Sequence, residues 1–159
     1  MTEQPFTHLD ASGQARMVDV SGKSVTVRSA TAEGLVGCPP AVVALLRSGE
    51  VPKGDVLAVA RIAGIAAAKR TADLLPLAHV IGVHAVSVDL EVVDAGVAIT
   101  VTVRAADRTG VEMEALTAVT VAALAVVDMV KGIDRDVAIT NARVIAKSGG
   151  RSGDWHREP

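Results

Sequence analysis

The amino-acid sequence predicts an α+β fold in which helices cover one face of an antiparallel sheet. Two segments, Val83–Val93 and Val97–Ala105, alternate apolar and polar residues as half-buried strands do, and Asp94–Gly96 joins them with residues typical of a hairpin turn. A third segment, Val111–Val130, is apolar on nearly every helical face and predicts a long buried helix. This mixture of a hairpin and a core helix is typical of α+β proteins.

The N-terminal half adds an arm, one strand and two helices. Residues 1–15 are polar and predict an extended arm, whereas Ser24–Ala32 alternates and predicts the first strand. Proline is tolerated in a first helical turn, so Pro39-Pro40 can open a short helix that runs through Leu46. After the turn Pro52–Asp55, with Asp55 as N-cap, a second helix runs from Val56 to about Leu74 and ends before Pro76.

The C-terminal part supplies the last strand and a tail. Val137–Lys147 predicts the strand, and residues 148–159 predict a flexible, glycine-rich tail. The whole order is strand, two helices, two strands, helix, strand. Without one of the helices this is the βαββαβ plan of ferredoxin-like folds, so we expect one domain over residues 1–159 with that sheet and an extra helix.

Composition excludes several classes of function. The net charge of −2 and the pI near 6.1 are unlike those of nucleic-acid-binding proteins. The aromatic residues are Phe6 and Trp155, near the two ends, so the strands offer no base-stacking platform. Cys38 is the single cysteine, which excludes an internal disulfide and a thiolate metal cluster and suits the cytoplasm. The N-terminus lacks a signal-peptide pattern, and charges interrupt the alanine-rich segments, so we expect no membrane anchor.

The apolar helix also predicts an oligomer and a first set of functional residues. A chain of 159 residues rarely surrounds such a helix alone, so we expect subunits to meet on it. Charged groups on a buried helix are costly unless they are paired or used, which singles out Glu112, Glu114, Asp128 and Lys131. From spacing alone, a surface ion pair explains Asp128 and Lys131 better than catalysis does, and carboxylates at a helix start are stabilised in any case.

Other candidates are a histidine and two groups of cations. His79 lies among apolar residues, where a histidine is more often a core group than a catalyst, and the spacing of His79 and His84 suits no metal pair. We therefore predict no metal site. Lys147–Asp154 combines two cations with glycines whose amides can approach a phosphate, although a disordered tail explains the same composition. If Lys53 and Arg28 lie close to this segment in the fold, they would add positive charge to a pocket for a polyphosphate.

Several of these segments resemble one enzyme family, the cyclic pyranopterin monophosphate synthases, also called molybdenum cofactor biosynthesis protein C. The Gly-Val-Glu-Met-Glu-Ala-Leu-Thr block from Gly110 and the Ala-Lys-Ser-Gly-Gly block from Ala146 are the most specific. One difference is that the family usually has Pro-Leu-Cys-His-Pro where this chain has Ala78 and Val80 around His79. The matching stretches are Met17–Val20, Lys53–Val56, Ala60–Ile65, Ala67–Thr71, Asp73–Leu74, Thr109–Ala118, Asp128–Met129, Lys131 and Ala146–Gly150.

The resemblance implies a lyase that converts 3′,8-cyclo-7,8-dihydroguanosine 5′-triphosphate into cyclic pyranopterin monophosphate and pyrophosphate. It implies a hexamer, built as a trimer of dimers, with sites between subunits and no cofactor other than Mg²⁺ that could accompany the triphosphate. By matching position, Asp128 is the expected acid or base, with Lys131, Lys53, His79, Glu112 and Lys147 as catalytic companions. The expected substrate contacts are Leu77, Ala78, His79, Met113, Glu114 and Arg28.

Two other classes of function are compatible with the predicted fold. A module that senses small molecules would need a groove but no cluster of acid, base and cations. An RNA-binding module is weaker, since Ser87–Val93 and Ile99–Arg104 carry no aromatic residue. Turnover of the cyclised nucleotide, with release of pyrophosphate, would distinguish the enzyme from both.

Overall fold

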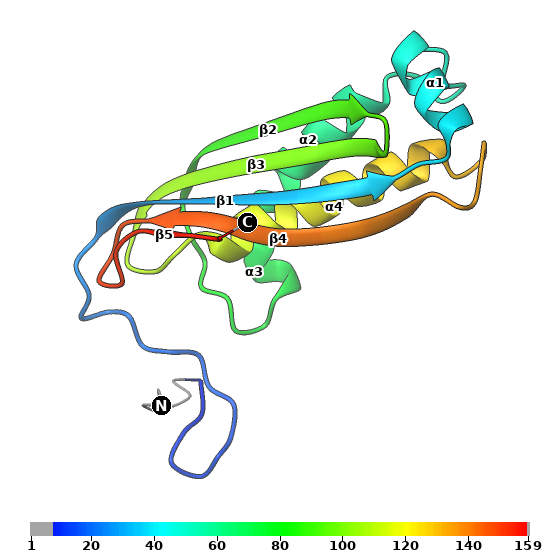
Figure 1. Ribbon diagram of the computed structural model, residues 1–159. Helices are drawn as coiled ribbons and strands as arrows, with labels where there is room; N and C mark the ends of the chain where they lie inside the picture. Colours follow the sequence, from blue (N-terminus) through cyan, green and yellow to red (C-terminus); the bar gives the residue numbers. More distant parts are fainter. Residues whose placement is uncertain (1–7, 159) are drawn as a thin grey trace.

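The computed structural model describes residues 8–158 and contains a five-stranded sheet with four helices (Figure 1). The α+β class predicted from the sequence is confirmed. The elements in chain order are β1 (Thr26–Gly37), α1 (Pro40–Ser48), α2 (Val56–Ala68), α3 (Thr71–Leu74), β2 (Val83–Val93), β3 (Gly96–Asp107), α4 (Glu112–Val130), β4 (Ala138–Ser148) and β5 (Trp155–His156).

The sheet has the strand order β2-β3-β1-β4-β5, and every neighbouring pair is antiparallel. Its first four strands follow the ferredoxin-like order, in which β1 and β3 lie in the centre. The β2–β3 hairpin turns at Asp94-Ala95, and Val93 pairs with Gly96, which was predicted to lie in the turn. The predicted ferredoxin-like antiparallel sheet is confirmed, and β5 adds a further strand at its edge.

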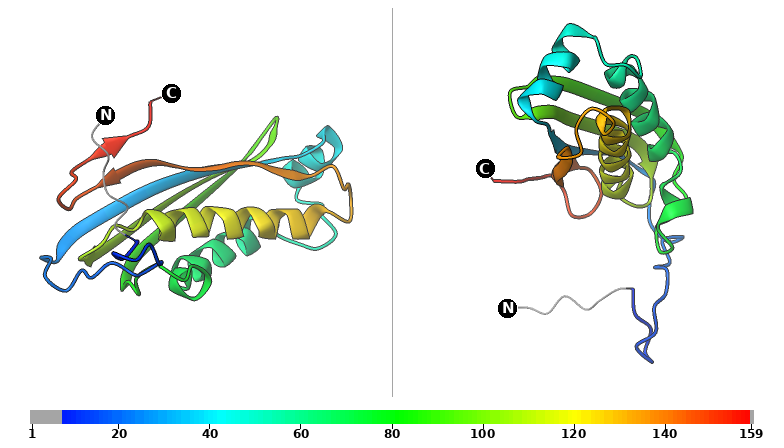
Figure 2. Two further views of the ribbon diagram at one scale, coloured as in Figure 1. Left: turned by 90° about the horizontal axis from the view of Figure 1, so that it is seen from below. Right: turned by 90° about the vertical axis from the view of Figure 1, so that its right-hand side faces the viewer.

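Helices α2 and α4 cover one face of the sheet, and Figure 2 shows both on the same side. The buried residues Ala30, Ala32 and Val36 of β1 point toward α4, into a core made of valine and alanine rather than aromatic residues. Polar pairs occupy the other face; for example, the hydroxyls of Thr31 and Thr102 are 3.0 Å apart. One layer of helices on a sheet whose buried apolar residues lie mainly on that side accounts for the alternating strands.

Small residues allow α2 and α4 to lie close to each other and to the sheet. A Cβ on Gly64 of α2 would lie 3.1 Å from the carbonyl oxygen of Ala118 on α4, and one on Gly34 of β1 would lie 2.6 Å from Val119. The two helices run in opposite directions, since the residues before α2 lie beside the end of α4. This packing fixes which residues meet at each end of α4.

Two boundaries predicted from the sequence were wrong. The first strand continues to Gly37 instead of ending at Ala32. The predicted helix over residues 56–74 is two helices, because it breaks at Arg70, whose φ of −120° and ψ of 16° are not helical. At the break the Arg70 amide donates to the Ala67 carbonyl at 2.9 Å, which forms a tight turn, and the Thr71 hydroxyl donates to the Ala68 carbonyl at 3.2 Å.

The N-terminal arm and the C-terminal segment both lie at the end of the sheet where α4 begins. Residues 1–7 of the predicted arm lie outside the described residues. The arm does not end at residue 15 as predicted but continues to Val25, just before β1, and its residues 8–25 contain a single bridge between Leu9 and Ala15. The C-terminal segment contains β5, which the sequence did not predict, and Trp155 pairs with Lys147 of β4 there. The Arg157 guanidinium lies 5.4 Å from the centre of the Trp155 ring.

Helix α4 is long and apolar enough to cross a membrane by composition, but it packs as a core helix. Ala115, Ala118, Ala122 and Val126 are fully buried against the sheet and α2. Leu124, in contrast, is 53% exposed on the outer side of the helix. The chain by itself therefore leaves part of this apolar helix in contact with water.

Candidate active site

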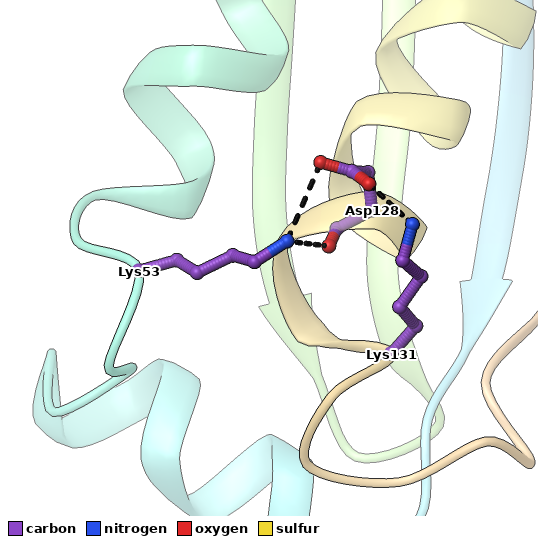
Figure 3. Close-up of polar contacts among 3 residues, drawn as sticks. All are labelled: Lys53, Asp128 and Lys131. Carbon is purple, nitrogen blue, oxygen red and sulfur yellow. Dashed lines mark hydrogen bonds and ion pairs between the residues drawn. The ribbon is translucent and has the colours of Figure 1, made fainter.

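The predicted catalytic residues gather at the two ends of α4. At its C-terminal end, Lys53 Nζ donates a hydrogen bond to the Asp128 carbonyl oxygen at 2.7 Å and lies 3.5 Å from Oδ2 of the same residue. Lys131 Nζ donates to Asp128 Oδ1 at 2.5 Å (Figure 3). The carboxylate of Asp128 is thus held between two ammonium groups that come from different parts of the chain.

Local structure explains why Lys53 reaches Asp128. Asp55 caps α2 by accepting a hydrogen bond from the Ala58 amide at 2.9 Å, which orients the turn that carries Lys53. The close packing of α2 on α4 then places this turn beside the last turn of α4. Lys131 follows Asp128 by three residues and shares its helix face.

The charge of the Asp128 side chain is well defined. The hydrogen bond from Lys131 lowers the pKa of this carboxyl, and the charges of Lys131 and then Lys53 lower it further. Asp128 is exposed, so water screens these interactions and they contribute little to stability. The result is an ionised, accessible carboxylate with two proton donors beside it, an arrangement suited to proton transfer.

A cavity of about 400 Å³ lies at the other end of α4. The residues that line it come from the arm, the α3–β2 connection and the start of α4. Five of the six predicted substrate contacts line it, with Arg28 as the exception. The lining residues are His8, Val18, Val20, Lys23, Leu77, Ala78, His79, Ile81, Thr109, Gly110, Glu112, Met113 and Glu114.

Glu114 is the most unusual residue of this cavity. Its side chain is buried, and no hydrogen-bond partner for Oε2 lies within residues 8–158. Burial, together with the smaller effect of the nearby charges of Glu112 and Asp107, raises the pKa of this carboxyl to about 6. Near neutral pH, Glu114 can therefore both take up and release a proton.

His79 and Glu112 are held by partners from distant segments. The Nε2 atom of His79 lies 2.7 Å from the carbonyl oxygen of Val18 in the arm. Glu112 Oε1 lies 3.5 Å from Lys147 Nζ at the end of β4, and Lys147 also donates to the Ser152 hydroxyl at 2.8 Å. This end of α4 thus combines a histidine, a lysine and two carboxyl groups.

Arg28 lines a second cavity, of about 430 Å³, next to the first. Its guanidinium donates to the carbonyls of Asp107 and Arg108, at 2.9 and 3.2 Å, which fixes its direction. A Cβ on Gly150 would lie 2.2 Å from Arg28 Nη1, so only glycine allows the tail to approach the guanidinium this closely. Lys23 and Arg151 also line this cavity, and Lys23 lines both cavities.

The structure brings the predicted site residues together as two groups and not as one. His79, Glu112, Glu114 and Lys147 lie at the start of α4, and Lys53, Asp128 and Lys131 lie at its end. Glu112 and Asp128 are sixteen positions apart, which corresponds to about 24 Å along a helix. Within one chain, therefore, the two groups cannot contact the same small reacting centre.

The sequence did not predict the arm residues that line the first cavity. Val18 and Val20 are the only half-buried residues in the described segment from 8 to 25. Their two-residue spacing in a polar segment was a signal that could have identified them as contacts. Among residues 8–158, no group of three histidine, cysteine, aspartate or glutamate side chains is arranged to hold a metal ion.

Comparison with known proteins shows which family this chain resembles. The family model described as the MoaC family matches residues 17–150. A Streptomyces coelicolor protein named cyclic pyranopterin monophosphate synthase is 64% identical, over 96% of this chain and 89% of that protein. A protein of the same name from Nocardioides sp. is 60% identical, over 99% of both chains. A third, cyclic pyranopterin monophosphate synthase 2 of Mycobacterium bovis, is 52% identical over 96% of this chain and 91% of its own length.

Proposed function

The chain belongs to the MoaC family, and we propose that it is the lyase that converts 3′,8-cyclo-7,8-dihydroguanosine 5′-triphosphate into cyclic pyranopterin monophosphate. The reaction releases pyrophosphate and belongs to the biosynthesis of the molybdenum cofactor. The observation that carries this assignment is the pair of residue groups at the two ends of α4, since each supplies a different part of the chemistry.

The first cavity suits the ring system of the substrate. Opening a purine-derived ring requires proton donors and acceptors close to it. His79, Glu112 and Glu114 line the cavity, and Glu114 changes its charge near pH 6. Leu77, Ala78 and Met113 line the same cavity and provide apolar contacts for a flat ring.

The second cavity suits the triphosphate. Lys23, Arg28 and Arg151 line it, and Lys147 reaches the Ser152 hydroxyl at its border. Closing a cyclic phosphate requires a hydroxyl in line with the α-phosphorus and cations on the charge that develops on the leaving pyrophosphate. Because Lys23 lines both cavities, one elongated substrate can occupy them together.

Asp128, with Lys53 and Lys131, completes the site from a neighbouring subunit in this proposal. The separation along α4 argues for two subunits at each site. Exposed apolar side chains on α2 and α4, namely Val59, Ile62 and Leu124, provide a surface on which subunits can pack. We assign the assembly as a hexamer, built as a trimer of dimers.

We propose that the enzyme is cytoplasmic and that it uses no cofactor of its own. The carboxyl groups, His79 and the lysines supply the proton transfers and the positive charge that the reaction requires. Mg²⁺ would enter as a companion of the triphosphate, because magnesium binds phosphate oxygens with few protein ligands.

The test is to incubate the purified protein with the cyclised nucleotide and to measure pyrophosphate and the pterin product. Asp128→Asn should abolish product formation and leave the fold intact, since Asp128 is exposed. Asp94→Asn is the matched control, because it removes an exposed carboxylate that pairs with Arg47 at 2.6 Å and with neither Lys53 nor Lys131. Failure of the unmodified protein to release pyrophosphate from authentic substrate would contradict the assignment.

A further inference from the structure

The arm meets the rest of the molecule at the first cavity. Between residues 8 and 25 every side chain is exposed except those of Val18 and Val20, and both of these line the cavity beside His79. Figure 1 shows the arm leaving the sheet on the side where α3 and the α3–β2 connection lie. The contact with His79 therefore anchors the middle of this long, otherwise exposed segment, and a hydrogen bond from Arg108 Nε to the Lys23 carbonyl at 3.0 Å holds its end near β1.

The hydrogen bond in this anchor defines the state of the histidine ring. A carbonyl oxygen only accepts hydrogen bonds, so the 2.7 Å contact between Val18 O and His79 Nε2 requires a hydrogen on Nε2. In a neutral imidazole the other nitrogen, Nδ1, then carries the lone pair. No partner for Nδ1 lies within residues 8–158, so Nδ1 remains available to a ligand in the cavity.

Little else restrains His79. It lies in the irregular connection between α3 and β2, and Val80, the next residue, is 88% exposed. A proline at position 80 would confine the backbone of His79, whereas valine leaves it free. The Ala78 side chain is too short to support the ring. The carbonyl of Val18 is thus the one polar group of residues 8–158 that holds the imidazole.

We propose that the Val18 carbonyl is a positioning group for His79: it fixes the Nε2–H tautomer and leaves Nδ1 as the proton acceptor toward the substrate. When Nδ1 accepts a proton from the substrate, the positive charge on the ring is stabilised by the hydrogen bond from Nε2–H to Val18. The arm is in this way part of the active site. The catalytic part of this proposal rests on the proposed function, but the tautomer does not.

The first test reads the tautomer without any substrate. Nitrogen-15 NMR of the imidazole rings, recorded at about pH 8.5 where a neutral histidine dominates, distinguishes Nε2–H from Nδ1–H. The chain has four histidines, and His79→Gln identifies the signals of His79. We expect the Nε2–H form in the full-length protein. A predominant Nδ1–H form would overturn the proposal whether or not the protein is a synthase.

The second test removes the carbonyl. A chain that begins at Met17 keeps it, and a chain that begins at Val20 lacks it, while both keep Lys23 and both lose His8. We expect the shorter chain to show mixed tautomers and a kcat lower by roughly tenfold to a hundredfold, with KM little changed, as for loss of a hydrogen bond to a charged group. Asp19→Ala in the full-length chain controls for the Asp19 side chain and should keep the Nε2–H tautomer. Equal kcat and equal tautomers in the two shortened chains would contradict the proposal.

Discussion

Glu114 should make the stability of this protein depend on pH in an unusual direction. Burial raises the pKa of its carboxyl from 4.5 to about 6, so the folded state binds the Glu114 proton more tightly than the unfolded state does. The stabilisation is fully present below pH 4.5 and is lost as the pH rises through 6. The rise from 4.5 to about 6 corresponds to about 2 kcal/mol of unfolding free energy.

The assay compares Glu114→Gln with the wild type by urea unfolding at about pH 4 and pH 7.5, below and above the two pKa values. Between these values the wild type should lose about 2 kcal/mol relative to the variant. Any fixed cost of burying the glutamine amide is the same at both pH values and cancels from this difference. Protein concentration must be equal throughout, because subunit association would add to the measured stability.

Glu91→Gln is the control for this experiment, since it removes a carboxylate that is exposed on β2. It should follow the wild-type pH dependence. If Glu114→Gln also follows the wild type between the two pH values, Glu114 does not carry a raised pKa in the folded protein and the reasoning from its burial is wrong.

Three further outcomes are expected. Leu124→Lys should dissociate the oligomer in sedimentation while the subunit stays folded, whereas Val126→Glu should unfold the subunit, because Leu124 is 53% exposed and Val126 is fully buried. Truncation after Gly149 keeps the β1–β4 pairing but removes the segment that closes over Arg28. Calorimetry should then show at least tenfold weaker binding of the triphosphate, which is about the effect of losing one charged hydrogen bond. The melting temperature should be nearly unchanged. Glu114→Ala and Asp128→Ala should each be nearly inactive, and unfolding and reassembling them together should restore part of the activity if each site combines two subunits.

Local patterns predicted the elements of the fold well, because a helix or strand that is buried on one side has apolar residues at regular intervals in its sequence. The β2–β3 hairpin and α4 were placed within two residues of their observed ends. The first strand was cut short because Glu33 and Gly34 interrupt its apolar pattern. Gly34 is in fact required by the close approach of Val119, a contact with a helix some eighty residues later that no local pattern reveals.

The break between α2 and α3 could not be predicted for a similar reason. Lys69 and Arg70 are good helix formers, so no local signal in the sequence marks the non-helical backbone that Arg70 adopts. For the site, the spacing of Asp128 and Lys131 predicted their ion pair correctly. Only the family resemblance grouped Lys53 with them, because local patterns could not show that it joins them from 75 residues away. No pattern showed that Val18 meets His79, since both contacts depend on the packing of distant segments.

The pairing of Trp155 with Lys147 has an optical consequence. The chain contains one tryptophan and no tyrosine, so its ultraviolet emission comes almost entirely from a single indole. That indole is 40% exposed, lies on β5 beside Arg157, and is attached to the segment that approaches Arg28. Quenching or a spectral shift would therefore report events in the C-terminal segment without an attached dye, and stopped-flow fluorescence could time the arrival of a triphosphate against the release of product.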